Sequence, residues 1–546
     1  MEKRFKIGLG LFIILTCISG LAIAGPQDLV VVKHGKNVAP ALKNPVPIIP
    51  GKLSQTVKLT PGQKKLLSPM ADFFIYGPAS PISTEQILKL RESRAKQPTG
   101  SIMGKKQKAV NARAYWDENS FTTFTTQSEV SSAVYGSHVV AGWNDFETYW
   151  FSNSIANWAV SHDGGTAFTG GLDGLPIEAA PGIVATGGDP AIDVSTDGTF
   201  YYSTICTYND LTNDLSAICL YESTDFGDSF NLTSYVYTLN TTEFLDKPLL
   251  GIDRINGKVY ITYTYLANTS PLFSIVAWNV TDDVFTTVAS NDDGLQGPVP
   301  AAGGDGSLYV AYEAWDAGGY PYIMINKSST YGATFLGDVT VYGPFIGAAE
   351  QNASEFCKRP AIKGNIGSNE FPSLAIDTRA SGTGHGNLYI AFNARDRGSN
   401  FLDTYLTRST DGGATWSTPI VANPRPAGDY SDKFFPWISV NGKGKVGLIY
   451  YDRKKTPGVD GPSNNNWWIS ANVRRFNPSL VFIDSLKLGP EFPVIVNNDY
   501  TATCYMAEYN SISANRKGSG DDNLFAFWGD NRFGDPDIQF SKVVPY

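Results

Sequence analysis

Acidic and basic side chains recur at corresponding positions of this 546-residue chain, where strand-like runs rich in Tyr and aliphatic residues end or begin. After such runs stand Asn144-Asp145, Asp396-Arg397, Asp452-Arg453 and Asp530-Asn531-Arg532. Before such runs stand Asp189, Asp246-Lys247, Glu370, Asp432-Lys433 and Glu508. Two interpretations stay open. Asp–Arg pairs can lock one repeated unit to the next through paired hydrogen bonds, or the charged groups can form a ring suited to binding a sugar or an anion.

From these sets we select the candidate site residues. Arginine binds carboxylates bidentately, so Arg397, Arg453 and Arg532 are the candidate ligand-binding residues. The candidate catalytic residues are Asp145, Asp432 and Tyr509. Tyr509 follows Glu508, but adjacent residues of a strand point to opposite faces, which argues against a direct Tyr–Glu pair. The four histidines have no metal-ligand spacing, so we expect neither a metal nor a cofactor.

The elements that must position these residues form an internal repeat. The motif Pro-x-x-x-[Ile/Val]-[Asp/Asn] occurs at Pro248, Pro372 and Pro436, a close variant occurs at Pro190, and looser copies start near residues 130, 298 and 510. Each copy is followed by a turn and a Tyr/aliphatic strand. Seven units of about 63 residues each have room for four short strands, which predicts an all-β, seven-bladed β-propeller.

A second repeated segment joins the later strands of these units. Three copies share a Ser/Thr-x-Asp-x-Gly-x-Thr/Ser-aromatic frame (Ser161–Phe168, Ser223–Phe230 and Ser409–Trp416), and Ser328–Phe335 keeps the frame without its Asp. Polar side chains bonding turn amides and a glycine at positive φ explain such a turn. Residues 116–546 therefore resemble the Asp-box propellers (bacterial neuraminidase repeats) of the sialidase-like superfamily. The resemblance implies structural roles for Asp163, Asp225 and Asp411, on the face away from the ligand site.

The resemblance leaves three functions open. The first is a sialidase-like glycoside hydrolase, such as an exo-α-sialidase. The second is a propeller that binds a saccharide or glycan without catalysis, and the third is a protein-interaction or envelope-assembly scaffold. The family's Phe/Tyr-Arg-Ile-Pro motif is absent, and residues 116–546 carry a net charge of −22, which opposes an anionic sugar. We therefore expect glycan binding by a monomer, with little turnover of a generic sialoside.

The amino-terminal part of the chain indicates export. Residues 1–24 have a basic start, an apolar run and an Ala-x-Ala end typical of a signal peptide, so we expect a secreted, periplasmic or cell-surface protein. Residues 25–115 form a Pro- and Lys-rich arm with 15 basic and 4 acidic residues, and one short helix is expected there. The acidic balance of the whole chain disfavours nucleic-acid binding, and no later apolar run is long enough to span a membrane.

Cysteines and strand counting give two further expectations. Cys206 and Cys219 flank a polar turn between two strand-like runs, so we expect a disulfide between them. Whether Cys357 and Cys504 pair stays open. The last unit ends after three strands, so we expect Ser120–Thr126, just upstream of the first unit, to supply the missing outer strand and close the ring.

Overall fold

The structure is a computed structural model. It describes residues 29–34, 111–113, 126–170, 173–348, 357, 359–395, 401–454, 468–493, 504–518, 520–530 and 536–544. The expected signal peptide and the short helix of the arm lie outside these residues.

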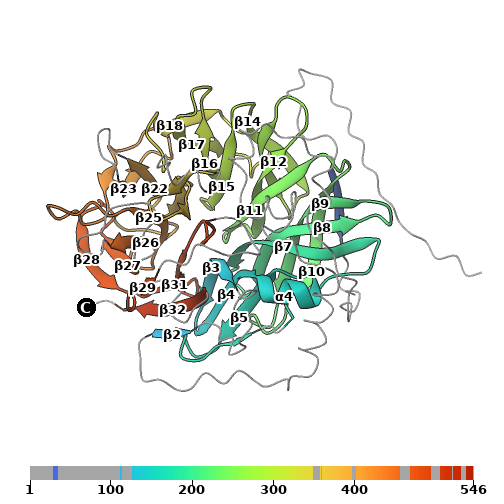
Figure 1. Cartoon of the computed structure of the whole chain (residues 1–546), viewed down its shortest axis with the longest axis horizontal. Coiled ribbons are helices and arrows are strands. Elements are labelled where there is room, and N and C mark those ends of the chain that lie inside the picture. The colour runs from blue at the N-terminus through green and yellow to red at the C-terminus, as the bar shows by residue number, and fades with distance from the viewer. Residues whose placement is uncertain are drawn as a thin grey trace, which may run out of the picture.

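Seven antiparallel sheets stand around a central axis, which confirms the predicted seven-bladed propeller (Figure 1). From the inner strand outward, blades one to three are β3 (Gln127–Tyr135), β4 (His138–Asp145), β5 (Ala156–Ser161) and β6 (Thr169–Gly170); β7 (Gly182–Val194), β8 (Phe200–Asn209), β9 (Asp214–Ser223) and β10 (Asn231–Thr238); and β11 (Phe244–Asp253), β12 (Lys258–Leu266), β13 (Phe273–Asn279) and β14 (Val284–Asn291).

The remaining four blades follow the same order along the chain. They are β15 (Leu295–Ala302), β16 (Leu308–Trp315), β17 (Pro321–Ser328) and β18 (Asp338–Tyr342); β21 (Ser373–Ile376), β22 (Leu388–Arg395), β23 (Leu402–Ser409) and β24 (Ile420–Val421); β25 (Lys433–Val440), β26 (Val446–Lys454), β27 (Trp468–Phe476) and β28 (Phe482–Lys487), with β29 (Phe492–Pro493) also paired to β27; and β30 (Ser511–Ala514), β31 (Leu524–Asp530) and β32 (Asp537–Val543).

The blades are held together mainly by apolar side chains between neighbouring sheets, as in other propellers. The close approach of blades one and two depends on Gly142, because a Cβ there would stand only 2.4 Å from the Tyr202 ring. Side-chain hydroxyls also bridge adjacent inner strands: Ser131 Oγ accepts a hydrogen bond from the Ile192 amide at 2.9 Å. Packing between blades thus fixes the position of every inner strand.

The ring is closed by an amino-terminal strand, as predicted, but the segment is a different one. The outer strand of blade seven is β2 (Asn111–Arg113), which pairs antiparallel with β32. The expectation that Ser120–Thr126 fills this place is corrected, because β2 already occupies the edge of β32. Only Thr126 of that segment is described, and its carbonyl accepts a hydrogen bond from the Phe146 amide beside blade one.

A second amino-terminal strand lies on the outside of blade two. β1 (Leu29–Lys33) pairs antiparallel with β10 and makes this blade five-stranded (Figure 1). Lys33 forms an ion pair with Asp283 of blade three at 2.8 Å, and His34 forms one with Glu178 at 3.0 Å. Basic groups of the arm are therefore held by acidic groups of the propeller.

The four repeated turns join the third and fourth strands of their blades. In the first, the Asp163 carboxylate accepts hydrogen bonds from Ser161 Oγ at 2.8 Å and from the Thr166 amide at 2.9 Å. Asp225 and Asp411 make the corresponding bonds in their turns. Hydrogen bonds from Thr415 lower the pKa of Asp411 to about 2. These carboxylates form hydrogen bonds within their own turns, as expected of structural residues.

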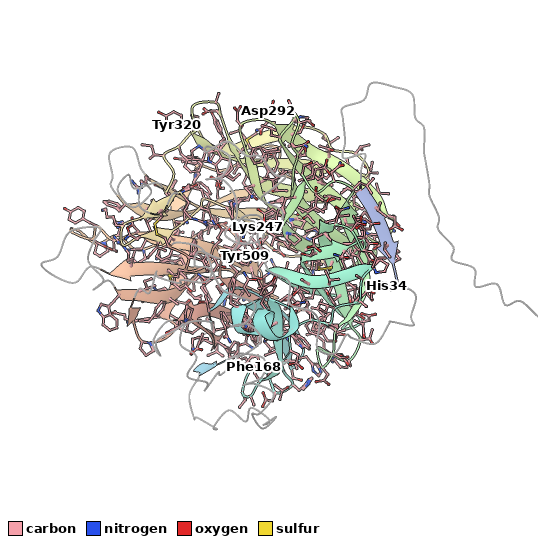
Figure 2. All side chains as sticks on the ribbon, turned by 45° about the vertical axis from the view of Figure 1, so that its right-hand side comes forward. His34, Phe168, Lys247, Asp292, Tyr320 and Tyr509 are labelled. Carbon is pink, nitrogen blue, oxygen red and sulfur yellow. A yellow bond between two sulfur atoms is a disulfide. The ribbon has the colours of Figure 1, made fainter. Side chains whose placement is uncertain are left out.

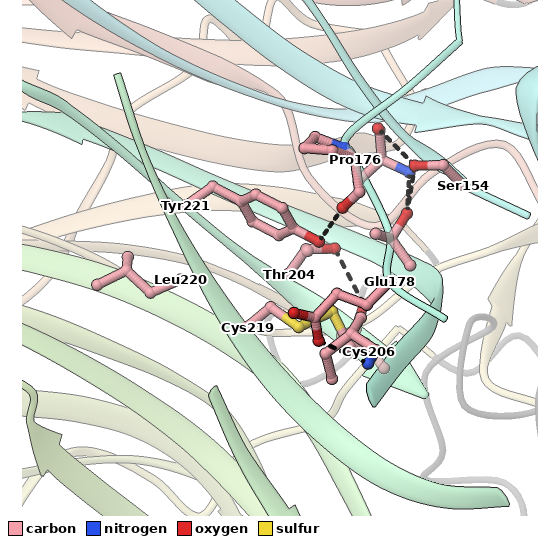
Figure 3. Close-up of a disulfide and its surroundings, with 12 residues drawn as sticks. Ser154, Pro176, Glu178, Thr204, Cys206, Cys219, Leu220 and Tyr221 are labelled. Atoms are coloured by element: carbon pink, nitrogen blue, oxygen red, sulfur yellow. Dashed lines mark hydrogen bonds between the residues drawn. A yellow bond between two sulfur atoms is a disulfide. The ribbon is translucent and has the colours of Figure 1, made fainter. Parts of the chain in front are cut away.

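Two disulfides are present. The predicted bridge joins Cys206 of β8 to Cys219 of β9, and both cysteines are buried (Figure 3). The second joins Cys357 to Cys504 and crosses 147 residues of the chain. Beside it lies a small hairpin, β19 (Ala361–Ile362) and β20 (Ile366–Gly367), whose Gly367 amide donates to the Cys504 carbonyl at 2.9 Å. The bridge thus ties the segment before blade five to the segment before blade seven.

Candidate functional site at the upper end of the central channel

One backbone position recurs at the start of each inner strand, at the end of the channel that we call the upper end. The residue there precedes Pro190, Pro248, Pro298, Pro372 and Pro436 in five blades. Around the ring the position is occupied by Glu129, Asp189, Lys247, Gly297, Phe371, Phe435 and Tyr509. In most blades the ladder has a two-residue bulge here, as between Asp246 and Leu249.

The bulge places several of these residues in an unusual backbone conformation. Glu129, Asp189 and Lys247 have φ values of 52°, 54° and 54°. Positive φ is uncommon for residues other than glycine and costs on the order of 1–3 kcal/mol each. Such strain persists where the surrounding structure imposes it, and it is concentrated at functional sites. Three charged residues with positive φ therefore lie at one end of the channel, which makes this end the candidate functional site.

Lys247, labelled beside Tyr509 near the middle of the molecule in Figure 2, is the centre of a buried ionic cluster. Its Nζ lies 2.5 Å from Glu508 Oε2, 3.2 Å from Asp189 Oδ2 and 3.5 Å from Glu129 Oε1, although its side chain is only 1% exposed. The ammonium also lies 5.1 Å from the centre of the Tyr509 ring. Side chains of blades one, two, three and seven therefore meet at one point.

Neutral polar groups hold the cluster in place. Asn144 Nδ2 donates to Glu129 Oε2 at 2.9 Å and to the Tyr505 hydroxyl at 3.2 Å, while Asn144 Oδ1 accepts from the Asp189 amide at 2.9 Å. Ser128 Oγ lies 2.7 Å from the same Tyr505 hydroxyl. Because one side-chain amide binds the Glu129 carboxyl group and the Asp189 backbone, both residues have fixed positions before any ligand arrives.

A pair of buried glutamates continues the cluster on the side of blades four and five. Glu313 lies near the end of β16, the second strand of blade four, and Glu370 leads into blade five. The Glu370 carboxylate accepts from the Ala348 amide, and the Arg395 guanidinium donates to the Ala348 carbonyl at 2.9 Å. The Glu313 carboxyl group lies within reach of the Glu370 carboxyl group, and the two interact directly. We call Glu129, Asp189, Lys247, Glu313, Glu370 and Glu508 the entrance cluster.

Burial governs the ionisation of the entrance cluster. It raises the pKa of Glu129 and Glu508, and it raises that of Asp189 well above the usual range, because the charged form loses its water. For Glu313, burial and then the neighbouring Glu370 raise the pKa well above its ordinary value. Burial opposes the charge on Lys247, but the carboxylates outweigh it and hold its pKa high. The carboxyl groups therefore tend to keep protons, which lets them donate hydrogen bonds as well as accept them.

The upper face also presents aromatic side chains to solvent. Tyr320 lies in the loop between β16 and β17, Tyr430 in the segment before β25, and Trp468 at the start of β27; they are 54%, 63% and 44% exposed. Glu508 is the most accessible member of the Lys247 ion pairs, with 12% of its side chain exposed. The upper face thus combines carboxyl groups with exposed aromatic rings.

The structure places three of the predicted site residues elsewhere in the hydrogen-bond network. Asp145 begins the helix α4 (Phe146–Ser152), where its Oδ1 accepts from the Thr148 amide at 3.2 Å and its Oδ2 from Asn157 at 3.0 Å. Arg453 is fully buried and forms an ion pair with Asp432 at 3.0 Å. Asp432 also accepts from the Leu402 amide of blade five. These contacts assign Asp145, Asp432 and Arg453 to the interior of the propeller, as interblade and helix-capping groups.

The other predicted residues have different outcomes. Tyr509 lies beside the entrance cluster, but burial raises its pKa well above the usual range, and its hydroxyl donates to the Pro190 carbonyl at 3.3 Å. A tyrosine in that state is a poor nucleophile. Arg397 and Arg532 lie outside the described residues. Asp189 and Glu508 pair with Lys247, and Glu370 lies beside Glu313, whereas Lys433 pairs with Asp429 and Asp452.

Glu129, Glu313 and Tyr505 were missed by reasoning from the sequence. Glu129 precedes Val130, so the proline that marks the same position in other blades is absent. Glu313 lies within β16, and the sequence pattern of this strand does not indicate what the Glu313 side chain faces. The sequence signal that could have identified this position is the variable residue before each repeated proline. No group of three His, Cys, Asp or Glu side chains within the described ranges is arranged to hold a metal ion.

None of the helices in the described part of the chain has the length and hydropathy needed to cross a membrane. No protein family profile matches the chain, and no curated protein matches it.

Three solved structures illustrate what the chain is similar to. A protein of unknown function from Dyadobacter fermentans has 13% identity and a TM-score of 0.40, with 80% of this chain and 98% of that chain covered. A Fusarium graminearum α-L-arabinofuranosidase in complex with arabinobiose has 12% identity and a TM-score of 0.40, and the match covers 80% of this chain and 98% of that chain. The Hadza microbial sialidase Hz136 has 13% identity and a TM-score of 0.38, and the match covers 71% of this chain and 79% of that chain. Likenesses this distant define no site residue, so geometry alone supports the proposal that follows.

Proposed function

We propose that the upper face of this propeller binds a saccharide through the entrance cluster. The observation that supports this most strongly is the variation at one repeated position. Positions that the fold needs are filled alike from blade to blade, as are the prolines that follow this position. The position itself carries two acids, a lysine, a glycine, two phenylalanines and a tyrosine. The shared backbone does not require these differences, so we attribute them to a function of the channel entrance.

Stability does not explain the cluster either. A lysine with three carboxyl groups in a dry site loses hydration that its ion pairs repay only in part, and a well-packed apolar group would be as stable or more so. Carboxyl groups whose pKa values are shifted by burial and by a specific charged partner are a frequent mark of a binding or catalytic site. Carboxyl groups that both donate and accept are well suited to sugar hydroxyls, and Tyr320, Tyr430 and Trp468 can pack against sugar C–H faces.

Glycoside hydrolysis is a second candidate, favoured by Glu313 and Glu370. A carboxyl group whose pKa is raised by burial can protonate a leaving oxygen near neutral pH, while a neighbouring carboxylate acts as base or nucleophile. Arg395 lies close enough to influence the charge of Glu370. Both candidates would act outside the cytoplasm if the expected signal peptide is used, and two disulfides are in keeping with that location.

The test begins with a glycan array and continues with calorimetry on the glycans retained. Glu508→Gln changes the most accessible acid of the Lys247 ion pairs, and we expect it to weaken binding roughly tenfold or more. The matched control is Glu491→Gln, whose carboxylate pairs with Lys487 at 2.9 Å away from the channel, and it should bind like the parent protein. Absence of any glycan ligand, or equal affinity in all three proteins, would refute saccharide binding and favour the scaffold interpretation.

Hydrolysis is tested separately on aryl glycosides, including 4-methylumbelliferyl sialoside and an aryl α-L-arabinofuranoside. Turnover that is lost in Glu370→Gln, while glycan binding is kept, would establish the hydrolase candidate. Binding without turnover of any aryl glycoside would leave the protein as a lectin-like propeller.

A further inference from the structure

A cavity occupies the centre of the propeller below the entrance cluster. Its volume is about 150 Å³, and the inner strand of every blade contributes to its wall. A site for one water needs roughly 10–15 Å³ measured in this way, so there is room for a small ligand with its water. Trp437 lines the cavity and packs on Tyr509, with ring centres 5.6 Å apart, so aromatic side chains separate the cavity from the cluster above.

Two arginines stand at the opposite, lower end of this cavity. Arg254 forms an ion pair with Asp193, and its Nε donates to the Val194 carbonyl at 2.9 Å. Arg516 follows the inner strand of blade seven, where its amide donates to the Val134 carbonyl at 2.8 Å. Both arginine side chains line the cavity. The side chains of Arg254 and Asp193 are 18% and 20% exposed, so solvent reaches this end.

The positive charge here is not balanced by the protein. Arg254 has Asp193 as its counter-ion, whereas the Arg516 guanidinium has no hydrogen-bond or ion-pair partner among the described residues. Arg516 is partly exposed, and a guanidinium that lines a cavity without a carboxylate partner is well placed to bind an anion. Partial burial, and then the charge of Arg254, lower the pKa of Arg516 to about 10, although the charge of Asp193 acts in the opposite direction.

Hydroxyl groups complete the lining. Ser439 lines the cavity, is only 4% exposed, and its Oγ has no hydrogen-bond partner among the described residues. On the blade-seven side, Ser132 Oγ lies 2.7 Å from Ser511 Oγ and 2.9 Å from Ser513 Oγ. Guanidinium forks and hydroxyl donors around a small chamber form the donor set that tetrahedral oxyanions prefer.

We propose that the lower half of the central channel is a binding site for a small oxyanion of the phosphate or sulfate type, with Arg516 and Arg254 as its cationic partners and Ser439 as a hydroxyl donor. The site is distinct from the entrance cluster and independent of the saccharide proposal. It lies on the lower side, where the repeated turns are, and its net positive charge contrasts with the acidic propeller body.

The experiment uses the whole protein and inorganic phosphate as the probe. Thermal melts and calorimetry compare sodium phosphate with sodium chloride at equal ionic strength and pH. We expect phosphate to raise the melting temperature and to bind with saturable heat, because a ligand that binds only the folded state stabilises it. In Arg516→Gln the phosphate-dependent shift should disappear and affinity should fall roughly tenfold or more.

Lys517→Gln is the matched control, because it removes the neighbouring exposed cation, which lies 5.2 Å from the centre of the Tyr135 ring and not in the cavity lining. It should keep the full phosphate shift. Sulfate should compete with phosphate, and phosphoserine in place of phosphate distinguishes an ester-linked group from a free ion. If the parent protein shows no shift beyond chloride, or if Arg516→Gln binds phosphate as the parent does, the proposal is wrong; the parent measurement decides this even if the variant fails to fold.

Discussion

At the scale of single residues, the same backbone position serves opposite purposes in different blades. At Lys247 it brings an ammonium group into contact with three acids, whereas at Gly297 it leaves room for the neighbouring Phe371 ring, which a Cβ would meet at 2.7 Å. The bulge orients this residue toward the channel, and the type of side chain determines which chemical group is placed there. Function can therefore change by substitution at one position per blade without rebuilding the fold.

Glu313 offers a direct test at this scale, because its carboxyl group is fully buried beside Glu370 and its pKa is raised. Above the ordinary value of 4.5, the folded state holds a proton that the unfolded state has lost, so stability falls as pH rises toward the folded-state pKa. Glu313→Gln removes this dependence. We expect no gain in melting temperature near pH 4 and a gain at pH 8 equivalent to roughly 1–3 kcal/mol.

Melting curves between pH 4 and pH 9 check this, with Glu491→Gln as the exposed control. A gain that is equally large at pH 4 and pH 8 would show that the substitution acts through packing and not through ionisation.

At the scale of elements, the upper face depends on segments inserted between blades. The β19–β20 hairpin precedes blade five, and the disulfide from Cys357 to Cys504 connects this region to the segment that carries Glu508. Lys363 of the hairpin accepts a hydrogen bond from Arg453 through its carbonyl, so the buried Asp432–Arg453 pair supports the hairpin from below. The predicted ligand-binding Arg453 thus has a supporting role at the edge of the site.

The two disulfides should differ in their contribution to stability. All four cysteines are buried, but Cys357–Cys504 spans 147 residues and Cys206–Cys219 spans 13. A longer loop restricts the unfolded chain more, so we expect the Cys357→Ala, Cys504→Ala variant to lose about 2 kcal/mol more than the Cys206→Ala, Cys219→Ala variant. Urea unfolding of both variants measures the difference. Equal losses would mean that the native state, and not the unfolded chain, sets the contribution.

At the scale of the whole molecule, the sequence predicted the features that each blade encodes locally. Prolines at bulges and Ser-x-Asp-x-Gly turns repeat because each blade needs its own bend and hairpin, and they predicted seven blades. The sequence could not identify β2, because three residues reading Asn-Ala-Arg have no strand pattern of their own. The ionic cluster was only partly predictable, since Glu129 and Glu313 meet Lys247 and Glu370 through ring geometry that no local spacing records.

The two amino-terminal strands should contribute differently to the whole molecule, and nested truncations separate them. A chain that starts at residue 35 lacks β1, but blade two keeps four strands, β7 to β10. A chain that starts at residue 114 also lacks β2, which leaves blade seven with three strands and exposes the edge of β32. Losing the three cross-strand residue pairs between β2 and β32 should lower the free energy of unfolding by roughly 1–3 kcal/mol. The unpaired edge of β32 should promote association between protein molecules.

Hydrogen exchange of full-length and truncated proteins is the measurement that fits this difference. We expect β32 amides to exchange as in the full chain when the protein starts at residue 35, and to lose protection when it starts at residue 114, because only the second truncation removes the pairing of Asn111–Arg113 with Gln539–Ser541. Size-exclusion chromatography should show self-association of the shorter chain alone. Unchanged protection of β32 in both truncated proteins would mean that contacts between β3 and β30 close the ring without β2.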